Sequence, residues 1–190
     1  MSTSETSTPT LSRERTDLLE TLRKHRRFLR HTVRDLTDDQ GLQAPSVSAL
    51  TLTGLIKHVA DTEEQWAAFM LDGPQTFGGF TEWEDADADA AADWTPDPEA
   101  EFVDPRFVVQ PHETLAFLLA RYDDVARRTD EIVAVVDLDS EHPLPTAPWF
   151  EPGARWSARR TILHIVAETS QHAGHADIIR ETIDGAKSMG

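Results

Sequence analysis

Residues 163–181 read LHIVAETSQHAGHADIIRE, and this stretch carries the pattern of one long amphipathic helix. Its apolar and small residues recur at three- and four-residue steps, which places them on one face of an α-helix. A polar stripe runs beside that face at steps of four, four and three residues, so its side chains stack along one line. The stripe consists of His164, Glu168, His172 and His175. We expect polar groups of another helix to lie opposite it.

The same periodicity predicts three further helices, over residues 11–37, 51–71 and 111–136. Start and stop signals support these bounds. Pro111 suits the first turn of a helix, and Gly73 followed by Pro74 ends the helix before it. The final helix is expected to begin after Ser157 as its N-cap and to end at Gly185.

No segment shows a convincing strand pattern. Residues 143–156, PLPTAPWFEPGARW, are rich in proline and aromatic residues and are expected to be irregular. Four long helices without strands predict an all-α fold, a four-helix bundle. A chain of 190 residues with 39% hydrophobic content can bury one substantial core. We expect a disordered tail over residues 1–10 and a single bundle domain over 11–190.

A long acidic loop is expected between the second and third helices, over residues 72–110. It holds eleven acidic residues between Asp72 and Asp104 and no lysine or arginine before position 106, so its charges repel one another. Its aromatic residues favour packing at a few points: Trp83, Trp94, Phe102 and Phe107. As a functional hypothesis, the loop lies over the approach to the substrate site.

Composition excludes several classes of function. The chain has no cysteine, so disulfides, zinc–thiolate sites and a cysteine nucleophile are excluded. Its net charge of −16 disfavours nucleic acid and anionic membranes as partners. A basic face on the first helix could bind nucleic acid, but a solvated face that balances the acidic loop is the preferred interpretation. Without a leader or an apolar span, a cytoplasmic protein is expected, either monomer or homodimer.

The polar stripe of the last helix suggests a metal site. Glu168 and His172, at i and i+4, can hold one cation between them, and His58 of the second helix lies among apolar residues that face inward. Two imidazoles and a carboxylate form a three-ligand site with open positions, which suits Zn²⁺ and also allows Ni²⁺, Fe²⁺ or Mn²⁺. Two plainer interpretations stay open. A lone inward histidine is often a core residue, and such Glu–His pairs are common on exposed helix faces.

A family resemblance accompanies these residues. The pairing of LTLTGLIKHVADTEEQW with ILHIVAETSQHAGHADIIRETIDG, preceded by PWFEPGARWSARR, resembles the DinB-like metal-binding four-helix proteins. It is most similar to the branch related to the N-terminal domain of mycothiol-dependent maleylpyruvate isomerase. The resemblance implies a divalent metal, usually zinc, held at positions that match His58, Glu168 and His172. Many relatives have histidine where this chain has Glu168.

The resemblance also implies chemistry on a low-molecular-weight thiol, mycothiol or bacillithiol, which a divalent metal activates as a thiolate. The reaction would be S-transfer to a small electrophile, or its isomerisation. The alternative is a non-catalytic metal-stabilised bundle that acts as a binding or stress-response protein. His175 is expected either to contact and orient one of the metal ligands or to form part of the pocket wall. His164 is assigned to a hydrogen bond in the core. Trp149 and Trp156 are candidate pocket walls.

Overall fold

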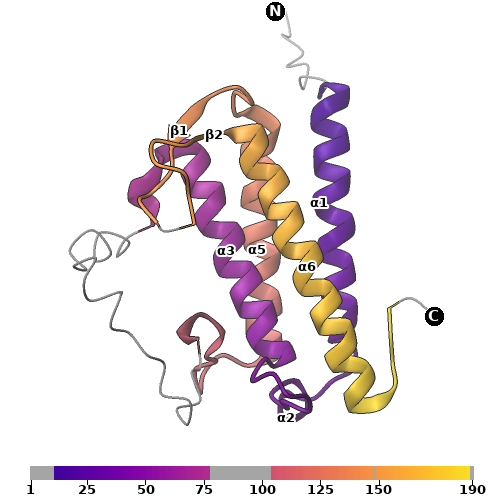
Figure 1. Cartoon of the computed structure of the whole chain (residues 1–190). Helices are drawn as coiled ribbons and strands as arrows, with labels where there is room; N and C mark the ends of the chain where they lie inside the picture. The colour runs from indigo at the N-terminus through magenta and orange to yellow at the C-terminus, as the bar shows by residue number, and fades with distance from the viewer. Residues whose placement is uncertain (1–10, 78–103, 148, 189–190) are drawn as a thin grey trace, which may run out of the picture.

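The computed structural model describes residues 11–77, 104–147 and 149–188. Four long helices lie side by side in this part of the chain (Figure 1): α1 (Arg13–Thr32), α3 (Leu52–Asp72), α5 (Leu115–Val135) and α6 (Ala158–Asp184). Helix α6 packs against both α1 and α3, and α3 also packs against α5. The predicted all-α four-helix bundle is therefore confirmed. None of these helices combines the length and apolar character that a bilayer span requires.

Each long helix begins at a hydroxyl side chain that accepts a hydrogen bond from a backbone N–H of the first turn. These N-caps are Ser12, Thr51, Thr114 and Ser157. Helices α3 and α6 end at Gly73 and Gly185, whose φ angles of 81° and 79° lie in the region that favours glycine. The predicted N-cap at Ser157 and the predicted ends at Gly73 and Gly185 are confirmed.

Two predicted helix bounds are wrong. The first helix was expected to reach residue 37, but α1 ends at Thr32 and is followed by a short separate helix α2 (Asp38–Gly41). Asp35 adopts a φ of 59° between them, a left-handed conformation that interrupts the helix. Pro111 was expected in the first turn of the third helix, yet α5 begins only at Leu115. The hydroxyl of Thr114 caps this later start.

The expectation that the chain contains no strand is also wrong. A two-stranded antiparallel sheet pairs β1 (Glu141–Pro143) with β2 (Arg155–Ser157), and His142 faces Trp156 in this register. The strands enclose the proline-rich stretch and lead into α6. Neither strand is longer than three residues, which is too short for an alternating pattern to be recognised in the sequence.

The loop between α3 and α5 is described only at its two ends. Two short 3-10 helices occur there, η1 (Pro74–Thr76) and η3 (Pro105–Phe107). Phe107 packs against the core, as the loop interpretation expected of its aromatic residues. The other predicted anchors, Trp83, Trp94 and Phe102, lie outside the described residues, as do the acidic segment 78–103 and the tail 1–10.

The core consists of two apolar clusters with a buried ion pair between them along the helices. One cluster contains Leu22 of α1 and the other contains Leu29 of the same helix, and Arg26 lies between these two residues. Its partner Glu63 on α3 has a fully buried side chain, and Arg26 Nε donates to Glu63 Oε2 over 3.0 Å. Burial opposes the charge on Arg26, but the carboxylates of Glu63 and Asp130 hold its pKa above the ordinary value.

Candidate metal centre

Helices α3 and α6 bring together the three side chains that the sequence singled out as metal ligands. His58 of α3 meets Glu168 and His172 of α6, and one ligand atom from each lies within 4.8 Å of the other two. The two imidazole rings are 4.8 Å apart and nearly perpendicular, at 80°. Nε2 of His172 lies 3.6 Å from Oε2 of Glu168. The arrangement joins one ligand of α3 to an i, i+4 pair of α6.

His58 is held in place by the C-terminal end of the long loop between α3 and α5. The ring of Phe107 stacks on the His58 ring, with centroids 4.1 Å apart and an interplanar angle of 27°. This close approach depends on Gly54 in the first turn of α3, because a Cβ there would lie 2.6 Å from the backbone oxygen of Phe107. Thr62, one turn further along α3, places its Oγ1 3.5 Å from His58 Nε2.

The electrostatics favour ligand-competent forms of two of these groups. Burial, assisted by the neighbouring charge of His172, lowers the pKa of His58 to about 4, so the ring is neutral at neutral pH. The polar contact with His172, opposed by burial, lowers the pKa of Glu168 below its ordinary value. A neutral imidazole and an ionised carboxylate are the forms that bind divalent metals.

An unpartnered nitrogen tests whether the site suits a metal ion. Nδ1 of His172 is buried and has no hydrogen-bond partner among the described residues. Leaving a buried polar atom unpaired costs free energy, so such an atom is expected where an ion or a bound molecule completes its surroundings. Two imidazoles and a carboxylate also form a donor set that suits zinc. The residues therefore fit the ion that the resemblance implied.

The two other residues of the polar stripe lie beside this group. The His164 ring packs edge-on against Trp66 and Trp156, with centroids 4.8 and 4.9 Å away. A hydrogen bond in the core was expected for His164. Its Nε2 instead lies 3.8 Å from Oε1 of Glu168, a candidate ligand. His175 is exposed, and its ring lies 5.8 Å from that of His172.

An open cleft of about 780 Å³ reaches this group from the α3 side. His58 and Glu168 line it, and so does Trp149, one of the two predicted pocket walls. Trp156 instead stacks on Trp66, with centroids 5.0 Å apart, and supports the wall from behind. Further aromatic rings and many polar groups complete most of the lining: Trp66, Phe77 and Phe150 among the aromatic residues, and Asp61, Thr62, Glu64, Gln65, Thr76, Arg106, Arg121 and His164 among the polar ones.

Several of these residues were not recognised in the sequence. Trp66 lies eight residues after His58, so the helical period could have indicated that it shares the inward face with His58. No local signal indicates Arg106 or Arg121. Arg121 is placed by ion pairs from α5 to Asp61 and Glu64 of α3, which depend on the packing of the two helices.

The comparisons with known proteins point in one direction. A family model described as Mycothiol-S-transferase matches residues 17–185, which includes all three candidate ligands. That description agrees with the resemblance to the DinB-like superfamily seen in the sequence. No curated protein and no solved structure gives a match to this chain.

Proposed function

Because this chain belongs to the mycothiol S-transferase family, we propose that it transfers mycothiol to a small electrophile with the help of one divalent metal ion. His58, Glu168 and His172 are the proposed ligands, and Zn²⁺ is the proposed ion, with Ni²⁺, Fe²⁺ or Mn²⁺ as alternatives. The observation that carries the proposal is the meeting of these three ligand atoms within 4.8 Å beside an open cleft.

The cleft distinguishes a catalytic site from a sealed structural one. Structural zinc sites close the coordination sphere with four protein ligands, whereas catalytic sites use three and leave a position for water or substrate. Among the described residues the group comprises three ligands, and two of them, His58 and Glu168, line the cleft. This arrangement supports an enzyme over a metal-stabilised binding protein. When bound, a divalent ion would lower the pKa of a coordinating thiol and keep it ionised at neutral pH.

The protein's own residues supply position and surroundings for the reaction. Phe107 stacks on the His58 ring and Thr62 Oγ1 lies 3.5 Å from its Nε2, so both contacts restrict the orientation of the ring. The aromatic rings that line the cleft exclude water from their part of the site, and the polar groups offer carboxylates, an amide and guanidinium groups to a hydroxyl-rich thiol. In the transfer, a bond forms between the thiol sulfur and the electrophilic carbon. The leaving group departs with its electron pair, and the thiol proton goes to solvent.

Metal analysis tests the ligand assignment. The purified protein should contain one divalent ion per chain, and His172→Ala should lose most of it, because two remaining ligands hold zinc far less well than three. His112→Ala is the matched control, since His112 is exposed and lies in the turn before α5. Equal metal content in wild type and His172→Ala would refute the assignment.

A conjugation assay tests the activity. The metal-loaded protein, incubated with mycothiol and monochlorobimane, should form the fluorescent thioether and release chloride faster than the metal-free protein does. Bacillithiol in place of mycothiol tests the choice of thiol. If neither thiol reacts faster than in the metal-free control, the metal-stabilised binding protein becomes the better description.

A further inference from the structure

A second pocket lies on the opposite side of the bundle from the candidate metal centre. Helix α1 packs mainly on α6 and only sparsely on α5, and a pocket of about 280 Å³ occupies this looser α1–α5 seam. The metal centre lies at the α3–α6 seam, across the bundle (Figure 1). We call this second site the arginine pocket, after the residues that line it: Arg23, Arg26, Arg27, Arg30, Tyr122, Asp123, Ala126, Arg127 and Asp130.

The charge of the arginine pocket is opposite to that of the chain. Five arginines and two aspartates line it, whereas the whole chain carries a net charge of −16. The positive charge is concentrated in a concave region, where it attracts anions more strongly than it would on a flat, exposed helix face. A small anion is therefore the expected ligand of the pocket.

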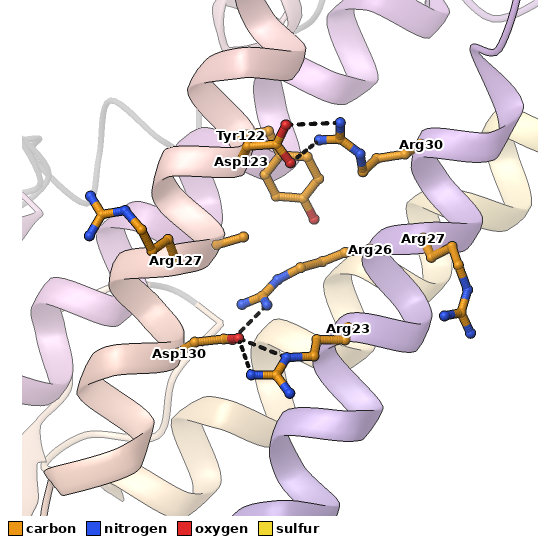
Figure 2. A pocket seen from close by; sticks show the side chains of 9 residues that line it. Arg23, Arg26, Arg27, Arg30, Tyr122, Asp123, Arg127 and Asp130 are labelled. Carbon is orange, nitrogen blue, oxygen red and sulfur yellow. Dashed lines mark hydrogen bonds and ion pairs between the residues drawn. The ribbon is translucent and has the colours of Figure 1, made fainter.

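Acidic partners offset much of this positive charge and hold it in place, among them Asp124 and Glu131, which pair with Arg127. Arg26, only 5% exposed, donates to Glu63 and, over 2.8 Å, to Asp130. Arg23 also donates to Asp130, over 2.9 Å, and Arg30 pairs with Asp123 across the seam. Figure 2 shows these guanidinium groups drawn toward α5 by the two aspartates. These pairs fix the positions of four of the five lining guanidinium groups, those of Arg23, Arg26, Arg30 and Arg127.

Two donors that line the arginine pocket have no ion pair or hydrogen bond of ordinary geometry in the described part of the chain. The hydroxyl of Tyr122 is buried and lacks a hydrogen-bond partner of ordinary geometry among the described residues. It makes only a minor interaction with the hydroxyl of Thr169, which itself donates to Ile165 O over 2.8 Å. Figure 2 shows the Tyr122 hydroxyl between Arg26 and Arg30, and Arg27 turned away from α5. No ion pair or hydrogen bond engages Arg27 within the described part of the chain.

We propose that the arginine pocket binds a small tetrahedral dianion, either inorganic phosphate or the phosphate group of a monoester. Such a group offers three or four acceptor oxygens and about two negative charges, which match guanidinium forks and a phenol donor. Arg27 would rotate over the anion, Arg30 and Arg23 would flank it, and the Tyr122 hydroxyl would donate from below. A polyanion such as nucleic acid fits less well, because the acidic body around the pocket repels a long phosphate backbone.

Isothermal titration calorimetry with sodium phosphate, at constant ionic strength set by sodium chloride, tests this proposal. One saturable site per chain is expected. Tyr122→Phe should weaken it about fivefold through one lost hydrogen bond, and Arg27→Gln at least about tenfold through a lost charge-assisted one. Neither change leaves a buried group without its partner, so both variants should keep the fold. Arg13→Gln is the matched control, since it removes the same charge from an exposed position at the start of α1.

Further arms separate the sources of the anion and the two sites. Tighter binding of glycerol phosphate than of inorganic phosphate would identify a monoester as the ligand, and the reverse would identify free phosphate. His172→Ala should bind phosphate as the wild type does, whatever its metal content. Absence of saturable binding would overturn the proposal, as would equal weakening by Arg27→Gln and Arg13→Gln. Binding of a short single-stranded DNA with no binding of phosphate would overturn it in favour of a nucleic-acid surface.

Discussion

Replacing Gly54 with alanine should show how closely Phe107, near the end of the long loop, supports the candidate metal centre. The new Cβ would lie 2.6 Å from the backbone oxygen of Phe107, whereas ordinary contacts of this kind begin at 3.4 Å. The Phe107 backbone must therefore retreat by about 0.8 Å. That movement shifts the ring that stacks on His58 at 4.1 Å.

Two opposed effects determine how much Gly54→Ala changes the free energy of unfolding. Alanine in place of glycine inside a helix gains about 1 kcal/mol of helix propensity. Crowding in a packed region costs about 1–3 kcal/mol. Gly54→Ala should therefore change the free energy of unfolding by between about 0 and −2 kcal/mol. Because Phe107 supports a ligand without binding the metal itself, the metal affinity should fall about tenfold.

Gly174→Ala provides the matched control. Gly174 also lies inside a helix, α6, and a Cβ there meets nothing within 4 Å, so the change should stabilise the protein by about 1 kcal/mol. Urea unfolding of both variants, with zinc affinity measured by competition against a chromophoric chelator, gives the comparison. If Gly54→Ala stabilises as much as Gly174→Ala and keeps wild-type metal affinity, the structural reasoning about this contact is refuted.

Further predictions concern the buried ion pair, the start of α6, the cleft wall and the metal. Glu63→Gln should lower the free energy of unfolding by about 3–5 kcal/mol in urea titrations, because it deprives buried Arg26 of a charged partner. Ser157→Ala should cost about 1 kcal/mol by removing the N-cap of α6, and an unchanged midpoint would contradict that role. Trp66→Ala should cost about 3–5 kcal/mol and slow thiol conjugation with little loss of metal. Excess chelator should lower the Tm of the metal-loaded protein, since an ion bound to the folded state stabilises it.

Much of the fold was predictable because its signals are local. The spacing of apolar residues predicts each long helix, and hydroxyl and glycine residues indicate where α3 and α6 begin and end. The end of α1 was missed because Asp35 adopts a left-handed conformation that aspartate only sometimes takes. The short strands were missed because segments of three residues pair only where the fold brings them side by side.

The chain by itself determined that Glu168 and His172 share one face of a helix, since an i, i+4 step has the same geometry in any α-helix. Only the tertiary structure decided that His58 meets them, because the packing of α3 on α6 depends on long-range contacts spread over the whole core. The same holds for Phe107, which reaches His58 only where Gly54 leaves space. The arginine pocket is the clearest case. Sequence analysis favoured a solvated basic face on the first helix, and the approach of α5 made that face one wall of a pocket closed below by Tyr122.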